Sequence, residues 1–340
     1  MTKQITVGKL KIGGGAPIAV QTMTNTDTAN VDATVGQVRV AAGAGCDLIR
    51  VSCPTRESTR ALKEIIQQTT IPIVADIHFN CKRAIEAIEA GVHCIRINPG
   101  NLSQAAVVDI VKAAFQANGT AIRIGVNAGS LDGDIVERAV ENCKLLEDMG
   151  FFNFKVSVKS SDVRTTIDAY RRLSRRIDYP LHVGVTESGT SFSGTIKSAI
   201  GIGSLLADGI GDTIRVSLAA NILEEVRVGR QILKSVGLLK NCVNIVACPT
   251  CARTTIDVIG IASELEDYCA SMAEPLKISV LGCVVNGIGE AKNSDIGVFG
   301  FRRDVAKIYV RGTEYAEVGN SEIVLAIKEI ISSLKRTAAN

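Results

Sequence analysis

Apolar and polar residues repeat along the first 240 residues as a short apolar strand, a polar turn and an amphipathic helix. Eight apolar segments, rich in Val and Ile, have the nearly continuous hydrophobicity of buried parallel strands. They are Ile18–Met23, Leu48–Cys53, Ile73–Ile77, Cys94–Asn98, Ala121–Val126, Phe154–Val158, Leu181–Val185 and Thr213–Ser217. The helical patterns between them include Asp32–Ala44, Ser58–Gln68, Lys82–Ala90 and Asp134–Met149. Eight such units predict an α/β fold, a TIM (β/α)8 barrel.

A doubly wound sheet is the alternative architecture for alternating strands and helices. It usually has fewer strands and carries a glycine-rich phosphate loop after its first strand. Here the first strand ends in Met23-Thr-Asn-Thr-Asp-Thr28, which contains no glycine. The barrel is therefore the better prediction.

The rhythm of the pattern changes after Val236-Gly-Leu-Leu-Lys240. Beyond it we expect strands at Val243–Ala247, Lys277–Leu281, Asp295–Phe299 and Ala306–Val310, and helices at Thr255–Ala273 and Ser321–Leu334. The sequence thus predicts a barrel over residues 1–240 and a small α+β domain over residues 241–340.

Composition narrows the classes of function. Apolar residues make up 46% of the chain, yet no apolar run reaches the roughly 18 residues that a membrane span needs. The polar start at Met1 lacks the apolar stretch of a signal peptide, so we expect a cytoplasmic protein with no membrane contact. A net charge of +3, few aromatic residues and no Trp argue against a nucleic-acid partner. Ten cysteines in such a chain should be mostly reduced thiols.

Basic residues recur at the carboxyl ends of the predicted strands, where TIM barrels carry their chemistry. They are Arg50, Arg96, Arg123, Lys155, Lys159 and Arg215, with the polar residues Asn98, Asn127 and Ser217 beside them. A single such Arg is more often part of an ion pair than of a ligand site. Five or six cations at one mouth instead predict a polyanionic ligand, because buried Lys and Arg are rare unless paired. We infer a small substrate that carries one or two phosphates, and the number of cations favours two.

Glu187 is an acid among these cations. It is either their counter-ion or a general acid or base beside a phosphate ester. Asp76 and His78 could be catalytic, but a strand-end Asp that caps the next helix is an equal alternative. His182, like any lone His in a barrel, is more often structural.

Three thiols and a carboxylate stand together in the second domain, as Cys248-Pro-Thr-Cys251 and Cys283-Val-Val-Asn-Gly-Ile-Gly-Glu290. A structural zinc site would need four N or S ligands, and none of the histidines lies in this domain. A redox-active thiol pair fits the CxxC spacing but leaves Cys283 unexplained. An iron–sulfur cluster with one replaceable ligand is the third chemistry, and the predicted turn at Gly287-Ile-Gly289 could donate N–H groups to its sulfides.

Several segments resemble one family, the 4-hydroxy-3-methylbut-2-enyl diphosphate synthases, which are iron–sulfur enzymes of the methylerythritol phosphate route to isoprenoids. The barrel segments are Val20-Gln-Thr-Met-Thr-Asn-Thr-Asp-Thr28, Ala75-Asp-Ile-His-Phe79, Ile95-Arg-Ile-Asn-Pro-Gly-Asn101, Arg123-Ile-Gly-Val-Asn127 and Gly184-Val-Thr-Glu187. In the second domain they are Cys248-Pro-Thr-Cys251 and Gly282-Cys-Val-Val-Asn-Gly-Ile-Gly-Glu290. The resemblance covers nearly the whole chain and is to the compact form, without a long insertion.

The resemblance implies a [4Fe–4S] cluster bound by Cys248, Cys251, Cys283 and Glu290. It implies reductive ring opening of 2-C-methyl-D-erythritol 2,4-cyclodiphosphate with loss of water, by two electrons from ferredoxin or flavodoxin, in a homodimer. The residues that would hold the diphosphate are Arg50, Arg96, Arg123, Asn127, Lys159, Arg215 and Ser217. Glu187 would protonate the departing hydroxyl, and Glu290 would act as a ligand that can leave the iron.

One position departs from the family pattern. Ile288 stands where the family usually has Pro between two glycines, so this segment is less rigid, although both glycines and Glu290 remain. Two other classes of function stay open from the residues themselves. One is a phosphosugar aldolase or isomerase, in which Lys159 forms a Schiff base and a structural zinc ion stabilises the C-terminal part of the chain. The other is a regulatory protein that senses iron–sulfur status.

Overall fold

The computed structural model of the chain describes residues 1–77, 80–98, 102–117, 119–127, 133–270 and 272–338. The chain divides into two compact units, residues 1–238 and 239–340. Each unit has its own sheet and its own apolar core.

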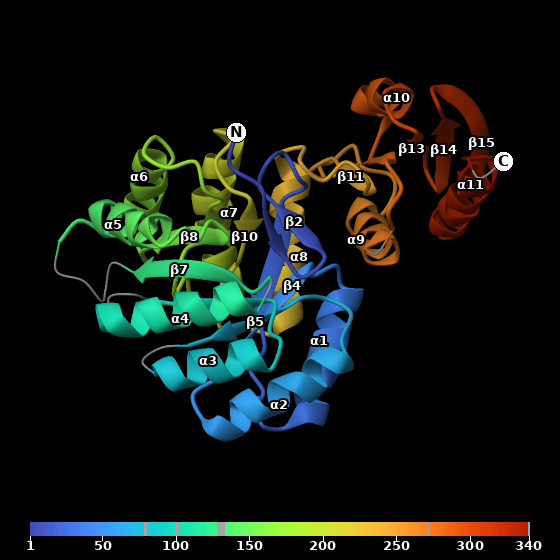
Figure 1. The fold of residues 1–340 in the computed structure, drawn as a ribbon. Helices are drawn as coiled ribbons and strands as arrows, with labels where there is room; N and C mark the ends of the chain where they lie inside the picture. Colours follow the sequence, from blue (N-terminus) through green and yellow to red (C-terminus); the bar gives the residue numbers. More distant parts are fainter. Residues whose placement is uncertain (78–79, 99–101, 118, 128–132, 271, 339–340) are drawn as a thin grey trace. The chain divides into compact units, whose positions relative to one another are not determined.

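The first unit is a barrel of parallel strands in the order β8-β7-β6-β5-β4-β3-β10-β9. A parallel bridge between Val156 and Leu181 joins the two ends of this sheet. Its strands are β3 (Ala19–Met23), β4 (Leu48–Ser52), β5 (Ile73–Asp76), β6 (Cys94–Ile97), β7 (Ala121–Asn127), β8 (Phe154–Lys159), β9 (His182–Val183) and β10 (Thr213–Ile214). Helices surround the strands, as Figure 1 shows. The predicted TIM barrel is confirmed.

The barrel helices are α1 (Val31–Gly43), α2 (Arg56–Gln67), α3 (Cys81–Glu89), α4 (Gln104–Gln116), α5 (Ile135–Asp148), α6 (Val163–Leu173), α7 (Ser191–Ala207) and α8 (Ile222–Ser235). Most of them begin at a short polar residue whose side chain accepts a hydrogen bond from the first turn of the helix. These caps are Asn30, Thr55, Asn80, Ser103, Asp134, Asp162 and Asn221. Asp76 is not among them, since Asn80 caps α3, so the capping interpretation of Asp76 is wrong.

The last two barrel strands are shorter than the sequence indicates. The predicted strands Leu181–Val185 and Thr213–Ser217 are reduced to β9 and β10, although the Arg215 N–H still donates to the Val183 carbonyl at 2.9 Å. After Val185 the backbone turns sharply, because Glu187 takes a φ of 51°. Polar strand-end residues therefore lie in loops here.

A hairpin that the pattern did not predict precedes the barrel. Strands β1 (Ile5–Val7) and β2 (Leu10–Ile12) pair antiparallel. Their apolar side chains form one buried cluster with residues near the amino ends of the barrel strands, namely Ala19, Leu48, Val74, Cys94 and Ala121. The hairpin closes that end of the barrel, which leaves the other end for chemistry.

The inward side chains change character two residues further along these strands. Leu48 is followed at that spacing by Arg50, Val74 by Asp76, Cys94 by Arg96, and Ala121 by Arg123. Because strand side chains alternate with a period of two, each charged residue lies on the same inner face as the apolar one before it. The barrel thus has an apolar floor and a charged interior above it.

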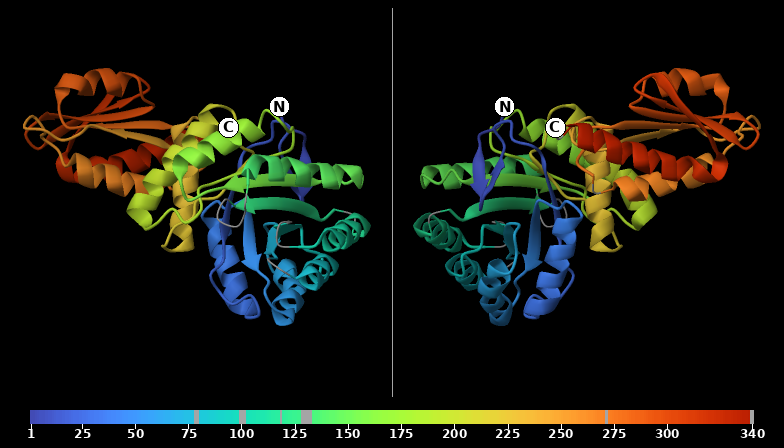
Figure 2. Two further views of the ribbon diagram at one scale, coloured as in Figure 1. Left: turned by 90° about the vertical axis from the view of Figure 1, so that its left-hand side faces the viewer. Right: turned by 90° about the vertical axis from the view of Figure 1, so that its right-hand side faces the viewer.

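The second unit is a sheet in the order β11-β12-β13-β14-β15 with helices on both faces (Figure 2). Its strands are β11 (Asn244–Ala247), β12 (Lys277–Leu281), β13 (Ile296–Arg302), β14 (Val305–Val310) and β15 (Thr313–Gly319), and its helices are α9 (Val258–Cys269), α10 (Val284–Lys292) and α11 (Ile323–Ala338). The first three strands are parallel and the last two pair antiparallel. Helices α9 and α11 share the larger core of this unit, and α10 packs on the other face.

Two elements of this unit were not predicted. Strand β15 has mostly exposed side chains, so the sequence shows no apolar pattern for it. Helix α10 begins directly after Cys283, in the segment expected to form a glycine-rich turn. The short 3-10 helix Asn320–Glu322 leads into α11. Within the parts of the chain that the structure describes, no helix combines the length and the apolar character needed to cross a membrane.

Candidate functional site

Cations fill the upper interior of the barrel. Exposure is 6% for Arg96, 2% for Arg123, 0% for Lys155 and 9% for Lys159, and the side chains of Arg50 and Arg215 are only 12% and 16% exposed. The strand registers align Arg96 with Arg123 and Arg123 with Lys155 on adjacent strands. The structure therefore brings the predicted cations together, and places Lys155 deeper than the mouth position expected for it.

Only a few carboxylates of the described chain touch these cations. Asp76 lies 3.3 Å from the Arg96 Nη1 and 3.6 Å from the Arg50 Nε, and it has a further interaction. Glu225 on α8 lies 3.4 Å from the Arg215 Nη2 and accepts from the Thr22 hydroxyl at 2.6 Å. The Arg123 Nε and Nη1, the Arg215 Nε and the Lys155 Nζ have no hydrogen-bond partner among the described residues.

Burial and mutual repulsion shift these groups. Burial, and after it the repulsion of Arg96, lowers the pKa of Arg123 to about 10. Burial and then the repulsion of Arg123 and Arg215 hold the pKa of Lys159 well below its ordinary value. Burial also lowers the pKa of Arg50, although Asp76 raises it in part. Groups with shifted pKa values gathered in one place are typical of a functional site. Here buried cations repel one another, so the site favours the binding of an anion.

The predicted polar partners lie at the same end of the barrel. Asn127 ends β7 in register with Lys159, and it has an interaction partner. The Ser217 carbonyl accepts a hydrogen bond from the Ser188 hydroxyl, and its own side chain is half-buried. His78, like residues 79 and 99–101 of the family segments, lies outside the described residues.

Glu187 is exposed at the turn after β9, and no ion pair or hydrogen bond of its carboxylate occurs within the described ranges. Its φ of 51° is unusual for a residue with a side chain and costs about 1 kcal/mol or more. Both neighbours are fixed, since the Thr186 N–H donates to the Ser160 carbonyl at 3.2 Å and Ser188 bonds to Ser217. A carboxylate that extends from a strained and fixed turn, and that has no partner among the described residues, fits an acid role better than a counter-ion role.

His182 is fully buried, and its Nδ1 lies 2.8 Å from the Thr213 hydroxyl. Burial and then the repulsion of Lys159 and Arg123 hold its pKa well below the ordinary value, so the ring is neutral near pH 7. Its Nε2 has no partner within the described part of the chain. The structure gives His182 a place in the barrel interior rather than at the mouth.

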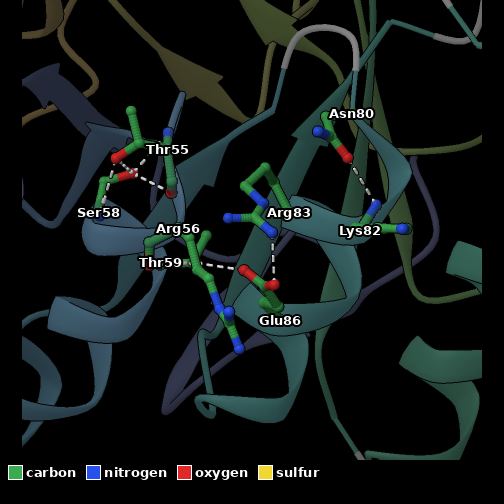
Figure 3. Close-up of polar contacts among 8 residues, drawn as sticks. All are labelled: Thr55, Arg56, Ser58, Thr59, Asn80, Lys82, Arg83 and Glu86. Carbon is green, nitrogen blue, oxygen red and sulfur yellow. Dashed lines mark hydrogen bonds and ion pairs between the residues drawn. The ribbon is translucent and has the colours of Figure 1, made fainter.

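The helices that follow β4 and β5 are tied together where they begin (Figure 3). The Glu86 carboxylate of α3 accepts from the Thr59 hydroxyl of α2 at 2.5 Å and from Arg83 at 2.6 Å. Thr55 and Ser58 form a capping box at the start of α2. These contacts join α2 to α3, the helices that follow the strands of Arg50 and Asp76.

The cysteine segments of the second unit meet at the carboxyl ends of β11 and β12. The Cys248 N–H donates to the Val280 carbonyl, and the Cys248 Sγ accepts from the Gly282 N–H, both at 3.1 Å. Cys283 is the next residue and forms the N-cap of α10, where a helix favours an anion. Cys251 is exposed, and its N–H donates to the Thr254 hydroxyl at 3.1 Å. Three thiols thus lie on two neighbouring loops.

Glu290 lies elsewhere on the same helix. Its carboxylate is 3.6 Å from the Nζ of Lys277, which begins β12, whereas Cys283 follows the end of that strand. Seven residues of helix separate the two positions by about 10 Å along the axis. In this conformation Glu290 is an ion-pair partner of Lys277, and its role as a metal ligand stays a prediction.

The glycines of this segment have a packing role. The predicted turn at Gly287-Ile-Gly289 is wrong, because both glycines lie inside α10. A Cβ on Gly287 would come within 2.5 Å of Phe299, so glycine lets the helix pack closely on β13. No group of three or more potential ligands in the described chain is arranged to hold a metal ion.

Sequence reasoning missed Glu225 as the partner of Arg215. It is only 5% exposed and lies on the buried face of α8 with Ile222, Val226 and Gly229. A charged residue on an otherwise apolar helix face was the signal that could have revealed it, because such residues are almost never buried unless paired.

Two family models match the chain. Residues 2–230 match the GcpE TIM-barrel domain, and residues 244–333 match the GcpE protein C-terminal domain. Solved barrels of dihydropteroate synthases from Yersinia pestis and Stenotrophomonas maltophilia are similar in fold alone. Each has a TM-score of 0.51 and 15% identity, and they cover 70% and 69% of this chain and 100% and 98% of their own.

The chain is also similar to curated proteins named 4-hydroxy-3-methylbut-2-en-1-yl diphosphate synthase (flavodoxin). It is 48% identical to that of Hyphomonas neptunium, over 97% of this chain and 90% of the relative. It is 48% identical to that of Caldanaerobacter subterraneus subsp. tengcongensis, over 99% and 97% of the two chains. The resemblance indicated by the sequence segments is confirmed, and the chain belongs to the GcpE family.

Proposed function

We propose that this chain is a 4-hydroxy-3-methylbut-2-enyl diphosphate synthase, which opens the ring of 2-C-methyl-D-erythritol 2,4-cyclodiphosphate by a two-electron reduction with loss of water. The observation that carries the proposal is the excess of buried cations in the barrel of a chain that aligns along its length with relatives of that name. Neither a sugar aldolase nor a regulatory sensor accounts for both parts of that observation.

The charges support a substrate with two phosphates. The cations assigned to it are Arg50, Arg96, Arg123, Lys159 and Arg215, and Asn127 and Ser217 supply polar contacts at the same end of the barrel. Asp76 and Glu225 are the carboxylates found against this set in the described chain. At least two positive charges remain, which a diphosphate would balance.

Glu187 is the proposed proton donor to the departing hydroxyl. Its backbone is held on both sides by hydrogen bonds to the loops after β8 and β10, so the point from which its side chain extends is fixed before the substrate arrives. An acid on a fixed backbone needs less reorganisation in the transition state than one on a mobile loop.

Cys248, Cys251 and Cys283 are the proposed ligands of a [4Fe–4S] cluster, which would supply the electrons when bound. Thiolates are the ligands that such clusters use, and the Gly282 N–H already donates to one of these sulfurs. Glu290 would be the fourth and replaceable ligand, and it would have to exchange Lys277 for the metal.

Flavodoxin or ferredoxin is the proposed electron donor, since the relatives carry flavodoxin in their names. A homodimer, in which each cluster domain serves the partner's barrel, is proposed from the family resemblance.

Anaerobic purification with iron, sulfide and EPR analysis tests this function. We expect about four irons and four sulfides per chain, a signal after reduction by dithionite, and turnover of the cyclodiphosphate with a strong one-electron donor. A colourless protein with one zinc would contradict the proposal and favour an aldolase or isomerase. A loaded cluster without turnover would favour the sensor.

A further inference from the structure

Two inward positions at the barrel mouth carry no side chain. Gly125 lies within β7, two residues beyond Arg123, and Gly184 lies two residues beyond His182. The alternation of strand side chains directs both positions into the barrel. Neither glycine has a positive φ, so the backbone itself would accept other residues. Glycine in a strand is destabilising and often marks a place where another group comes close to the backbone. Since neither backbone conformation requires glycine, we conclude that glycine stands at these two positions to leave room for a neighbouring group.

Gly125 leaves room for the Arg96 guanidinium. A Cβ at position 125 would lie 2.8 Å from the Arg96 Nε and 3.3 Å from its Nη2. Arg96 reaches this place from the neighbouring strand β6 while its Nη1 stays near Asp76. The guanidinium therefore rests directly on the backbone of Gly125.

Gly184 leaves room for the Lys159 ammonium in the same way. A Cβ at position 184 would lie 2.6 Å from the Lys159 Nζ and 2.4 Å from the Arg215 carbonyl oxygen. Lys159 comes from β8, whose neighbours in the barrel are β7 and β9. The two glycines thus flank the strand that carries Lys159.

We propose that Gly125 and Gly184 are positioning residues, which seat Arg96 and Lys159 where the two cations can bind the phosphates of the substrate. The inference rests on the proposed function for its substrate, and on the distances above for its mechanism. In most TIM barrels bulky side chains fill each interior layer. Here the missing side chains let charged groups from adjacent strands occupy the layer, so their position is set by backbone rather than by mobile side chains.

Gly125→Ala is the cleaner test, because the three atoms nearest to the added methyl group all belong to the Arg96 side chain. We expect the KM for the cyclodiphosphate and the Kd for inorganic pyrophosphate to rise about 10- to 100-fold, since a displacement of about 1 Å can cost that much. The melting temperature should stay within a few degrees. Gly229→Ala is the matched control, because its Cβ would press on Val20, at 3.1 Å, away from the cations; its affinities should not change.

A double-mutant cycle shows whether Gly125 acts through Arg96. In an Arg96→Gln background, Gly125→Ala should have little further effect on either constant. Equal losses in both backgrounds, or unchanged affinity in Gly125→Ala itself, would overturn the inference. Gly184→Ala should weaken pyrophosphate binding too, with a larger loss of stability because the backbone at Arg215 must shift. Failure of the wild type to turn over substrate would sink the proposed function, whereas the pyrophosphate measurements would still decide the role of the glycines.

Discussion

The barrel interior and the cysteine loops differ in how firmly the chain holds them. Arg96, Arg123 and Lys159 are at most 9% exposed and lie on paired strands. Cys251 is exposed, and Cys248 and Cys283 are half-buried on loops. The barrel cations are thus assembled before any ligand arrives, while the three thiols are held less firmly. If both proposed sites are correct, the barrel is ready for its substrate without help, whereas the cysteine site would take its final form only with its metal.

The helix beside the cysteines is suited to such a dependence. Gly287 and Gly289 lie within α10, and each costs about 1 kcal/mol relative to Ala in a helix. Its packing against Phe299 and Gly297 compensates for this weak propensity. A ligand that drew Glu290 toward the thiols would have to reshape this helix and break the ion pair with Lys277.

Removal of a proposed metal ligand should show the largest difference between the two regions. We expect Cys283→Ala to lose the cluster and all measurable turnover, because two thiols and a carboxylate cannot hold it. Pyrophosphate affinity and the melting of the barrel should be unchanged, since the cations are held without it. Iron and sulfide analysis and calorimetry measure these effects.

Cys242→Ala is the control for this substitution. Cys242 is also half-buried and in the same unit, and its thiol donates a hydrogen bond to the Leu239 carbonyl. It should keep a full complement of iron. A normal iron content in Cys283→Ala would show that the ligand assignment is wrong, and a loss of pyrophosphate binding would show that the two regions are coupled.

The next largest effect should come from the loss of the proposed acid, Glu187. We expect Glu187→Gln to lower kcat about 100- to 10,000-fold, with the cluster and the KM little changed, because general acid catalysis contributes that much. Glu89→Gln, at an exposed helical position, should behave as wild type. Full activity in Glu187→Gln would remove the acid role.

A smaller effect should follow from the hydrogen bond that fixes Glu187. Ser188 is fully buried and donates to the Ser217 carbonyl. Ser188→Ala should lower kcat about 10-fold with little change in KM, because loss of a buried hydrogen bond costs about 1–3 kcal/mol and loosens the turn. In Ser193→Ala, which removes an exposed hydroxyl from the first turn of α7, kcat should not change. A KM effect alone would place Ser188 in substrate binding.

Sequence reasoning reached the barrel and its cations because both follow from a local pattern. Strand periodicity defines the inner face, and Arg96 and Arg123 lie on it at the spacing that the pattern predicts. The pairing of Glu225 with Arg215 could not be predicted in this way, because it depends on which face of α8 packs against the strands. Helix α10 was missed since its stability comes from Phe299 and Gly297, which are distant contacts rather than local propensity.

Lys155 offers a test of whether the barrel interior holds an excess of positive charge. It is buried there, yet it is not among the residues proposed to bind the substrate. Burial lowers its pKa from 10.5 to about 8, with a small opposing effect of Cys94 and a further lowering by Arg123. A lysine whose pKa is depressed on folding destabilises the native state wherever it is charged in both states. Lys155→Met should therefore raise the free energy of unfolding by about 1–4 kcal/mol at pH 7.

The gain should depend on pH in a definite direction. Below about pH 8 the lysine is protonated in both states and the full penalty applies. Between about pH 8 and 10.5 the unfolded chain binds more protons, so the wild type gains stability as pH rises and the advantage of Lys155→Met shrinks. Urea unfolding at pH 7 and 9.5 measures both values, with Lys112→Met at an exposed position as a control. A destabilised Lys155→Met at pH 7 would mean that the ammonium is paired, and that the barrel has a smaller excess of charge than its substrate would neutralise.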